Sequence, residues 1–406
     1  MEGAVKSSIA TFGHYFTGSS RDNFLQSKLI ILWGWNPVDT RFGSDTARYL
    51  AEAKEKGTKI ISVDPRQNRS AKILDAEWIQ IKPGTDTALM AAMAFVMITE
   101  NLLDQAFLDH YTSGFESYSD YVLGKDDGIP KTPAWAQEIC GTPVDTTTEL
   151  ARDYASIKPG ALMPGWAPGR SAHGEQFHRA AAVMAAMTGN MGIEGGYAAG
   201  GTDVIPFGLI NAGLPNPQQK HHRVHVSKVY DAILKGTSGG YPSDCKLLYV
   251  TGSNMLNQNL NLNKGVKAMA IPELIVAHDL FMTTTTQYAD LILPVTHFME
   301  REDLIQPYVG GAYRIHMDKV VDAPDGPRSD LSIFTDLASR LGIEDYNEKS
   351  EEEWLKYICE TTPDMPDLES LRQQKIQKID TPQPWLAFKE QIEDADNNPF
   401  PTPSGK

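Results

Sequence analysis

Two short apolar runs on either side of one amphipathic segment, between Lys28 and Arg66, constrain the fold of this chain more than any other feature. Leu29 to Leu32 is continuously apolar, which is typical of a parallel strand buried on both faces. The next segment carries an apolar stripe and ends at Gly57, a residue suited to a left-handed helix end. Lys59 to Val63 is the second apolar run. This stretch therefore predicts a strand, helix and strand of a parallel sheet.

Polar residues follow each of these two strands directly. Gly34-Trp35-Asn36 comes after the first strand and Asp64-Pro65-Arg66 after the second. In open α/β sheets, ligands bind beyond the carboxyl ends of the strands, and an acid after the second strand often holds part of a nucleotide. The G-x-G-x-x-G fingerprint of an ordinary dinucleotide site is absent from this stretch. A nucleotide site and a unit without any ligand therefore both stay open at this point.

The same order of features occurs a second time. Lys246 to Thr251 is an apolar strand followed by Gly252-Ser253-Asn254, and Leu274 to Ala277 is a strand ended by His278-Asp279. Two copies are too few for a solenoid, and they favour two related half-sites, which suits two copies of one cofactor. The alternative is that all strand–helix–strand units look somewhat alike.

These features predict an α/β protein built of two related doubly wound domains with mostly parallel sheets. We expect the first domain over residues 1–200, the second over 201–345, and a helical return segment over 346–406. The net charge of -15 argues against a nucleic-acid partner, because no basic stripe gathers phosphates. Cys140, Cys245 and Cys359 are too far apart in sequence to form a C-x-x-C metal motif.

Other polar positions offer further candidate contacts, each with a simpler alternative. Gly84-Thr85-Asp86 starts a long helix and either caps it or holds a ligand. Arg170 lies in a Gly/Pro-rich loop that suits an anion clamp. The hydroxyls of Thr283 to Thr286 can hold phosphate, whereas Arg301 has acidic neighbours that can simply pair with it. Asp330 is either a helix cap or a ligand contact.

Several of these stretches, in the same order, resemble motifs of the molybdopterin oxidoreductases of the dimethyl sulfoxide reductase family. Within that family the similarity is to the catalytic subunits of anaerobic dimethyl sulfoxide reductases. The matching segments are WGWNPVDT (Trp33 to Thr40), VDPR (Val63 to Arg66), IKPGTDTAL (Ile81 to Leu89), GWAPGR (Gly165 to Arg170), MTGNMGIEGG (Met187 to Gly196), GSN (Gly252 to Asn254), YADLILP (Tyr288 to Pro294) and PTPSGK (Pro401 to Lys406).

The resemblance implies a molybdenum or, less often, tungsten ion held by two molybdopterin guanine dinucleotides, one in each half-site. Motif matching assigns one dinucleotide to Trp33, Gly34, Asn36, Thr40, Asp64, Arg66, Gly84, Thr85 and Asp86. It assigns the other to Gly252, Asn254, His278, Asp279, Arg301 and Asp330, with Trp166 and Arg170 nearer the pterins. In such enzymes the metal transfers oxygen to or from an S- or N-oxide. We nominate no general acid, general base or protein ligand of the metal.

The resemblance also implies what lies outside these residues. We expect the chain to be the central region of such a subunit, with a 4Fe-4S cluster and the metal ligand in a preceding region. The implied partners are an iron–sulfur electron-transfer subunit and a membrane anchor subunit, in an exported, membrane-associated complex. Two alternatives stay open, namely the same fold acting on formate, thiosulfate or polysulfide, and a metal-free scaffold subunit. Retention of both half-sites argues against the scaffold.

Overall fold

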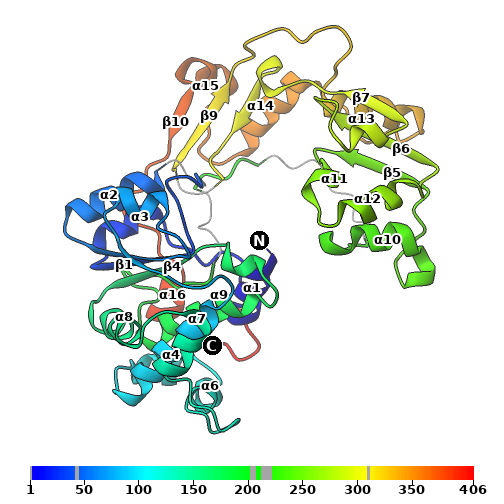
Figure 1. The fold of residues 1–406 in the computed structure, drawn as a ribbon. Helices are drawn as coiled ribbons and strands as arrows, with labels where there is room; N and C mark the ends of the chain where they lie inside the picture. Colours follow the sequence, from blue (N-terminus) through cyan, green and yellow to red (C-terminus); the bar gives the residue numbers. More distant parts are fainter. Residues whose placement is uncertain (1, 42–44, 202–206, 212–221, 309–310) are drawn as a thin grey trace. The chain divides into compact units, whose positions relative to one another are not determined.

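The computed structural model describes residues 2–41, 45–201, 207–211, 222–308 and 311–406, and these residues form two compact units. Unit 1 contains Met1–Gly208, Pro307–Tyr313 and Lys378–Lys406, and unit 2 contains Leu209–Gln306 and Arg314–Gln377. The chain therefore leaves unit 1 and returns to it twice. Figure 1 gives the labels of the helices and strands.

Unit 1 is organised around a four-stranded parallel sheet in the order β3-β2-β1-β4. The strands are β1 (Leu29–Trp33), β2 (Lys59–Val63), β3 (Glu77–Ile79) and β4 (Gly160–Pro164). The helices are α1 (Glu2–Phe12), α2 (Thr46–Glu55), α3 (Arg69–Ile73), α4 (Asp86–Thr99), α5 (Gln105–Tyr111), α6 (Phe115–Val122), α7 (Pro133–Cys140), α8 (Val144–Ser156), α9 (Glu175–Met187) and α16 (Lys389–Glu393).

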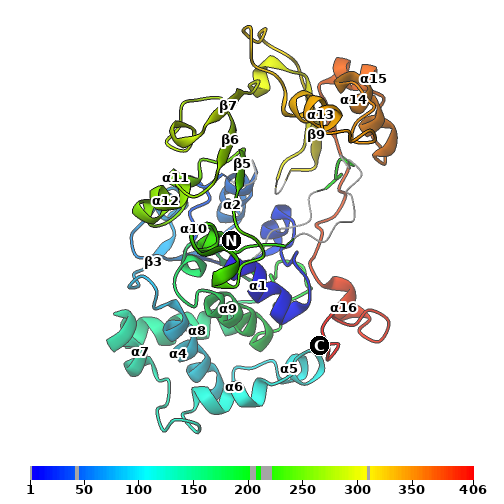
Figure 2. The ribbon, with the colours of Figure 1, turned by 90° about the vertical axis from the view of Figure 1, so that its right-hand side faces the viewer.

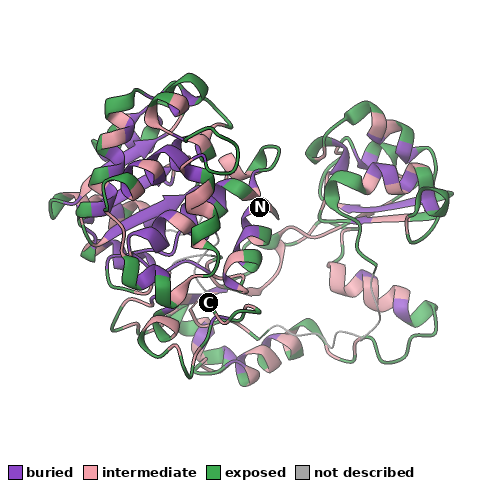
Figure 3. Cartoon of the chain, turned by 90° about the horizontal axis from the view of Figure 1, so that it is seen from below, coloured by how far each residue is buried: buried purple, intermediate pink, exposed green. Residues whose placement is uncertain are grey.

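Strand β1 is buried along its whole length because helices cover both faces of the sheet (Figure 3). Leu29, Ile31 and Trp33 point into one core with residues of α4 and α9, whereas Ile30 and Leu32 point into another with Leu50 of α2. The alternation along β1 thus serves two apolar cores, so the strand needs apolar residues at every position. The predicted doubly wound arrangement is confirmed here.

The parallel sheet of unit 2 repeats three strands of the unit 1 sheet, namely β1, β2 and β3. It holds the parallel strands β5 (Leu247–Thr251), β6 (Leu274–Asp279) and β7 (Leu291–Pro294), with β6 between the other two, as β2 lies between β1 and β3. One face packs on α10 (Val229–Lys235), α11 (Met255–Gln258) and α12 (Leu262–Met269). On the other face, α13 (Asp330–Arg340) places Phe334 against His278.

A second, smaller sheet in unit 2 has the order β10-β9-β8 and pairs β8 with β9 in antiparallel fashion. Its strands are β8 (Asp303–Ile305), β9 (Tyr313–Met317) and β10 (Ile376–Lys378), and the helices α14 (Glu351–Thr361) and α15 (Leu368–Gln374) lie beside it (Figure 2). The α/β class with parallel-strand sheets is therefore as predicted, with this antiparallel pair as an addition.

The segment expected to be a separate helical return is instead divided between the two units. Residues up to Gln377 belong to unit 2, and Lys378–Lys406 belongs to unit 1. The physical reason is aromatic packing, because the Phe388 ring stacks on Phe12 of α1 at 4.8 Å and Phe400 lies 5.1 Å from Phe388. These rings are part of the unit 1 core.

Candidate functional site

The loop after β1 is fixed by the side chain of Asn36. Its Oδ1 accepts hydrogen bonds from the Ser70 backbone N–H at 3.1 Å and from the Ser70 hydroxyl at 2.6 Å. The Ser70 Oγ in turn accepts from the Val38 N–H at 3.0 Å. Gly34 starts this loop in the left-handed region with φ of 59°, and a Cβ there would lie 2.6 Å from Pro168. The loop after β1 is therefore tied to the first turn of α3.

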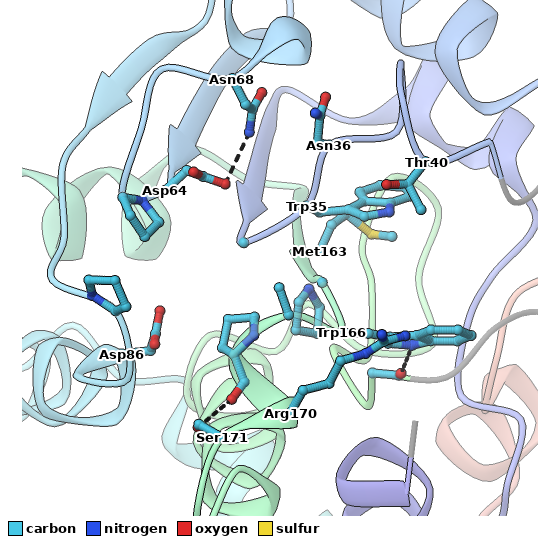
Figure 4. A pocket seen from close by; sticks show the side chains of 18 of the residues that line it. Trp35, Asn36, Thr40, Asp64, Asn68, Asp86, Met163, Trp166, Arg170 and Ser171 are labelled. Atoms are coloured by element: carbon cyan, nitrogen blue, oxygen red, sulfur yellow. Dashed lines mark hydrogen bonds between the residues drawn. The ribbon is translucent and has the colours of Figure 1, made fainter. Parts of the chain in front are cut away.

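Asp64 at the end of β2 is held by its own loop. Its Oδ1 accepts from the Arg66 N–H at 3.1 Å, and its Oδ2 accepts from the Asn68 side-chain amide at 3.0 Å (Figure 4). The carboxylate is thus pre-oriented before any ligand arrives, since its own loop supplies hydrogen-bond donors to both oxygens.

Asp86 lies at the start of α4 and is tied to the core. Its Oδ1 accepts a hydrogen bond from the Trp33 Nε1 at 2.9 Å, and Trp33 itself is completely buried. Burial raises the pKa of the Asp86 carboxyl above its ordinary value, while the Trp33 N–H opposes that rise. The structure thus places Trp33 beneath the site as a support of Asp86. The Thr85 hydroxyl donates to the Lys82 carbonyl at 2.7 Å, and Thr85 does not line the cavity described below.

These loops surround a cavity of about 660 Å³ in unit 1. Among the predicted residues, the structure brings Gly34, Asn36, Thr40, Asp64, Arg66, Gly84, Asp86, Trp166 and Arg170 to its wall. Asn36, Thr40 and Asp64 approach from the ends of β1 and β2, whereas Trp166 and Arg170 come from the loop after β4 on the other side (Figure 4). The Trp166 indole donates to the Gly201 carbonyl at 2.7 Å.

Arg21 also lines the cavity and was not predicted from the sequence. Its side chain is almost completely buried, donates to the Tyr197 hydroxyl at 3.0 Å and lies 5.3 Å from the Trp35 ring. Tyr197 and Trp35 are lining residues as well. A planar cation held against an indole is a suitable partner for phosphate groups or a polar ring. No hydrophobic periodicity in the sequence around Arg21 indicated that this residue would line the cavity.

The loops at the ends of β5 and β6 in unit 2 repeat the three bonds around the asparagine, and they hold the aspartate by donors at the same two sequence positions as in unit 1. Asn254 Oδ1 accepts from the Thr285 N–H at 3.3 Å and from its hydroxyl at 2.7 Å, and the Thr285 Oγ1 accepts from the Leu256 N–H at 3.0 Å. Asp279 Oδ1 accepts from the Phe281 N–H at 3.1 Å, and its Oδ2 accepts from the Thr283 hydroxyl at 3.2 Å.

The sequence spacing of the two sets also agrees. The hydroxyl residue stands six positions after the aspartate in each copy, and the loop N–H comes two positions after the asparagine. Gly252 has φ of 59°, the same value as Gly34. We call Asn36, Asp64 and Ser70 the first half-site, and Asn254, Asp279 and Thr285 the second half-site. The two strand–helix–strand units are therefore related in detail and not only in topology.

Other predicted residues of unit 2 are already engaged with protein atoms. His278 is buried, with its Nδ1 2.7 Å from the Asp330 Oδ1 and its Nε2 2.8 Å from the Tyr249 hydroxyl. Arg301 Nε lies 3.3 Å from the Asp303 carboxylate, as the simpler alternative for Arg301 stated. The suggested phosphate role of the threonine run does not fit the structure, because Thr285 and Thr286 are buried and bonded internally.

Within the described residues, no group of three or more His, Cys, Asp or Glu side chains is placed so that it could hold a metal ion. Among the same residues, no helix is long and apolar enough to cross a bilayer.

Comparison with known proteins shows which family the chain belongs to. The family model described as molybdopterin oxidoreductase matches residues 3–340. The chain belongs to the molybdopterin oxidoreductase family. It is 35% identical to the dimethyl sulfoxide reductase DmsA of Escherichia coli, over 98% of this chain and 53% of that protein. It is 31% identical to a trimethylamine-N-oxide reductase of Haemophilus influenzae, over 98% of this chain and 54% of that protein.

A solved structure shows the same fold. Acetylene hydratase from Pelobacter acetylenicus superimposes with a TM-score of 0.72 at 20% identity, over 100% of this chain and 58% of that one. This molybdopterin oxidoreductase chain spans about half the length of the curated relatives that it matches. The family resemblance seen in the motifs is thus confirmed, whereas the individual cofactor contacts stay predictions.

Proposed function

We propose that this chain is the cofactor-binding part of a molybdenum enzyme that reduces an S- or N-oxide, such as dimethyl sulfoxide, by oxygen-atom transfer. The observation that carries the proposal is the repeated half-site, because a family member with two matching half-sites suits two copies of one cofactor. The relatives named as dimethyl sulfoxide and trimethylamine-N-oxide reductases support this substrate class.

Each half-site fits the nucleotide end of a molybdopterin guanine dinucleotide. Guanine presents two donors, N1–H and N2–H₂, and a pre-oriented carboxylate such as Asp64 or Asp279 accepts both. In unit 1 the cavity also offers Arg21 and Arg170 as cations for the pyrophosphate, beside the rings of Trp35 and Trp166. Carboxylates that accept hydrogen bonds and cationic side chains thus line one cavity that is large enough for an extended ligand.

The bound molybdenum cofactor supplies the redox chemistry in such enzymes, and the protein binds and orients it. In this chain Asp64 and Asp86 would hold the donor-rich end, and the Trp33 indole N–H, which donates to Asp86, would keep that carboxylate in place. Trp166 and Arg170 line the wall that follows β4 and would face the pterin. For the enzyme as a whole we propose an iron–sulfur electron-transfer subunit and a membrane anchor as partners, in an exported, membrane-associated complex.

The test is cofactor analysis of protein purified from a host that makes molybdopterin guanine dinucleotide. We expect molybdenum and two equivalents of GMP per chain after acid release. Turnover is measured on the enzyme as a whole, where we expect oxidation of a reduced viologen dye by dimethyl sulfoxide or trimethylamine N-oxide. Protein that carries neither GMP nor molybdenum would refute the cofactor assignment. Cofactor-loaded protein that turns over neither oxide would refute the substrate class alone.

A further inference from the structure

The Ser70 hydroxyl has a single arrangement that satisfies all its neighbours. Ser70 is completely buried, and its oxygen receives the Val38 N–H at 3.0 Å. An N–H can only donate, so the Ser70 oxygen is the acceptor in that bond and its own hydrogen points to Asn36 Oδ1 at 2.6 Å. The Ser70 hydroxyl therefore links the Val38 backbone to the Asn36 side chain, which lines the cavity.

The orientation of the Asn36 carboxamide follows from the same reasoning. The Ser70 backbone N–H also donates to this atom of Asn36, at 3.1 Å. A backbone N–H requires an acceptor, so the atom must be the carbonyl oxygen and not the nitrogen of the amide. The NH₂ group is therefore turned the other way, and its nitrogen lies 2.8 Å from the Asp39 carboxylate.

Thr285 imposes the same arrangement in unit 2. It is completely buried, and its Oγ1 receives the Leu256 N–H at 3.0 Å and donates to Asn254 Oδ1 at 2.7 Å. The Thr285 N–H lies 3.3 Å from the same oxygen. Two separate units with different neighbours thus keep one hydrogen-bond circuit. Packing alone explains a buried hydroxyl in one unit, but it does not explain why these three bonds run in the same direction in both units.

We propose that Ser70 and Thr285 are equivalent positioning residues, each of which turns the asparagine of its half-site so that the amide NH₂ points away from the hydroxyl and can donate to the ligand. In unit 1 one of its two hydrogens is directed to Asp39, and the other is the one that would serve the ligand. This inference rests on the proposed cofactor, and it assigns polarity within each half-site. The asparagine offers donors, whereas the aspartate offers acceptors. A guanine dinucleotide matches this pair, because its keto and phosphate oxygens accept and its N1–H and N2–H₂ donate.

The first test removes one hydroxyl at a time from the cofactor-loaded protein and measures the GMP released per chain. In Ser70→Ala the Val38 N–H loses its partner, and Asn36 Oδ1 loses the 2.6 Å bond from the hydroxyl while it keeps the longer 3.1 Å bond from the backbone N–H, so the carboxamide is held less firmly. We expect this variant to retain about half of the wild-type GMP, because one of two half-sites is affected, and we expect Thr285→Val to do the same. The double variant should retain almost none, and Thr285→Ser should restore the wild-type value.

The second test separates positioning from folding. Asn36→Asp, made in an Asp39→Asn background so that no two carboxylates face each other, keeps an oxygen for the Ser70 N–H and hydroxyl but replaces the donor NH₂. The first half-site should then lose its GMP while the melting temperature stays near that of Asp39→Asn alone. Ser156→Ala is the matched control, because this exposed hydroxyl on α8 donates only to the Arg152 carbonyl among the bonds of the described residues.

The outcomes distinguish the two proposals. Wild-type protein without GMP overturns the cofactor assignment itself. Wild-type protein with two equivalents, together with full GMP in Ser70→Ala and Asn36→Asp, overturns the positioning role while leaving the cofactor assignment in place. Loss of GMP in Ser70→Ala but not in Asn36→Asp also overturns it, since the donor would then be irrelevant.

Discussion

Replacing Trp33 by phenylalanine should destabilise unit 1 chiefly by detaching the carboxyl of Asp86. The indole N–H lies 2.9 Å from Asp86 Oδ1, and Trp33 has no exposed surface. A hydrogen bond to a charged group contributes about 1.5–3 kcal/mol, and the Asp86 side chain is largely buried. We therefore expect a coupling energy of that size between the two side chains.

The effect should depend on pH in a defined direction. Burial holds the pKa of Asp86 above its ordinary value of 3.8, so the folded state binds this proton more tightly than the unfolded state. The ionised carboxylate thus lowers the stability of the folded state as pH rises through the folded pKa. Removing the Trp33 N–H raises that pKa further, so the loss in Trp33→Phe should be largest at neutral pH. The loss of stability in Trp33→Phe should be smaller in acid, because the neutral carboxyl of Asp86 accepts a weaker hydrogen bond from the indole.

The assay is a double-mutant cycle of Trp33→Phe and Asp86→Ala, read by amide hydrogen exchange in β1 and α4. These elements report unit 1 alone, which avoids treating a two-unit chain as a single transition. Trp78→Phe is the matched control, because its indole donates at 2.9 Å to the neutral carbonyl of Asp64. A coupling energy between Trp33 and Asp86 below about 0.5 kcal/mol at neutral pH would refute the reasoning, because mutations at independent sites add only to within about that error.

Three further predictions follow from other contacts. Asp64→Asn combined with Asp279→Asn should abolish guanine nucleotide binding while leaving the melting temperature nearly unchanged, and normal GMP content would contradict the assignment. Burial lowers the pKa of His178 from 6.5 to about 4, so unit 1 should lose roughly 3 kcal/mol of stability as pH falls across that range. His178→Leu should remove this loss, as measured by hydrogen exchange at several pH values. The Arg372 guanidinium holds the pKa of Glu302 at about 2, well below its ordinary 4.5. The stability that this ion pair gives unit 2 is therefore present above pH 4.5 and lost towards pH 2, and acid titration of Glu302→Gln should lack that transition.

The sequence allowed prediction of those features that arise from neighbouring residues. The continuous run from Leu29 to Leu32 indicated a strand buried on both faces, and the structure shows two separate apolar cores on its two sides. The paired Asn and Asp positions indicated two related units, because each lies directly after a strand and the carboxyl ends of parallel strands meet at one edge. Each of these patterns lies within a short stretch of the chain, so the sequence alone was enough to predict the feature.

Contacts between distant segments left no such signal. Arg21 reaches the cavity because Asn23 and Ser27 bind the carbonyls of Gly196 and Gly195, far along the chain. The partner of the Trp33 indole lies 53 residues away, so the sequence could not distinguish a residue at the site from one that supports it. The division of the last segment likewise depended on the packing of Phe388 against Phe12.

That aromatic contact sets an order of events during synthesis. Helix α1 is synthesised well before Phe388, the ring that stacks on its Phe12, and most of unit 2 is made in between. The strands β1 to β4 are complete by Pro164, so the sheet can form early with part of one apolar face still open to solvent. A nascent chain therefore exposes that surface while more than two hundred residues are translated. This interval is one in which a chaperone would find a binding site that the finished protein has covered.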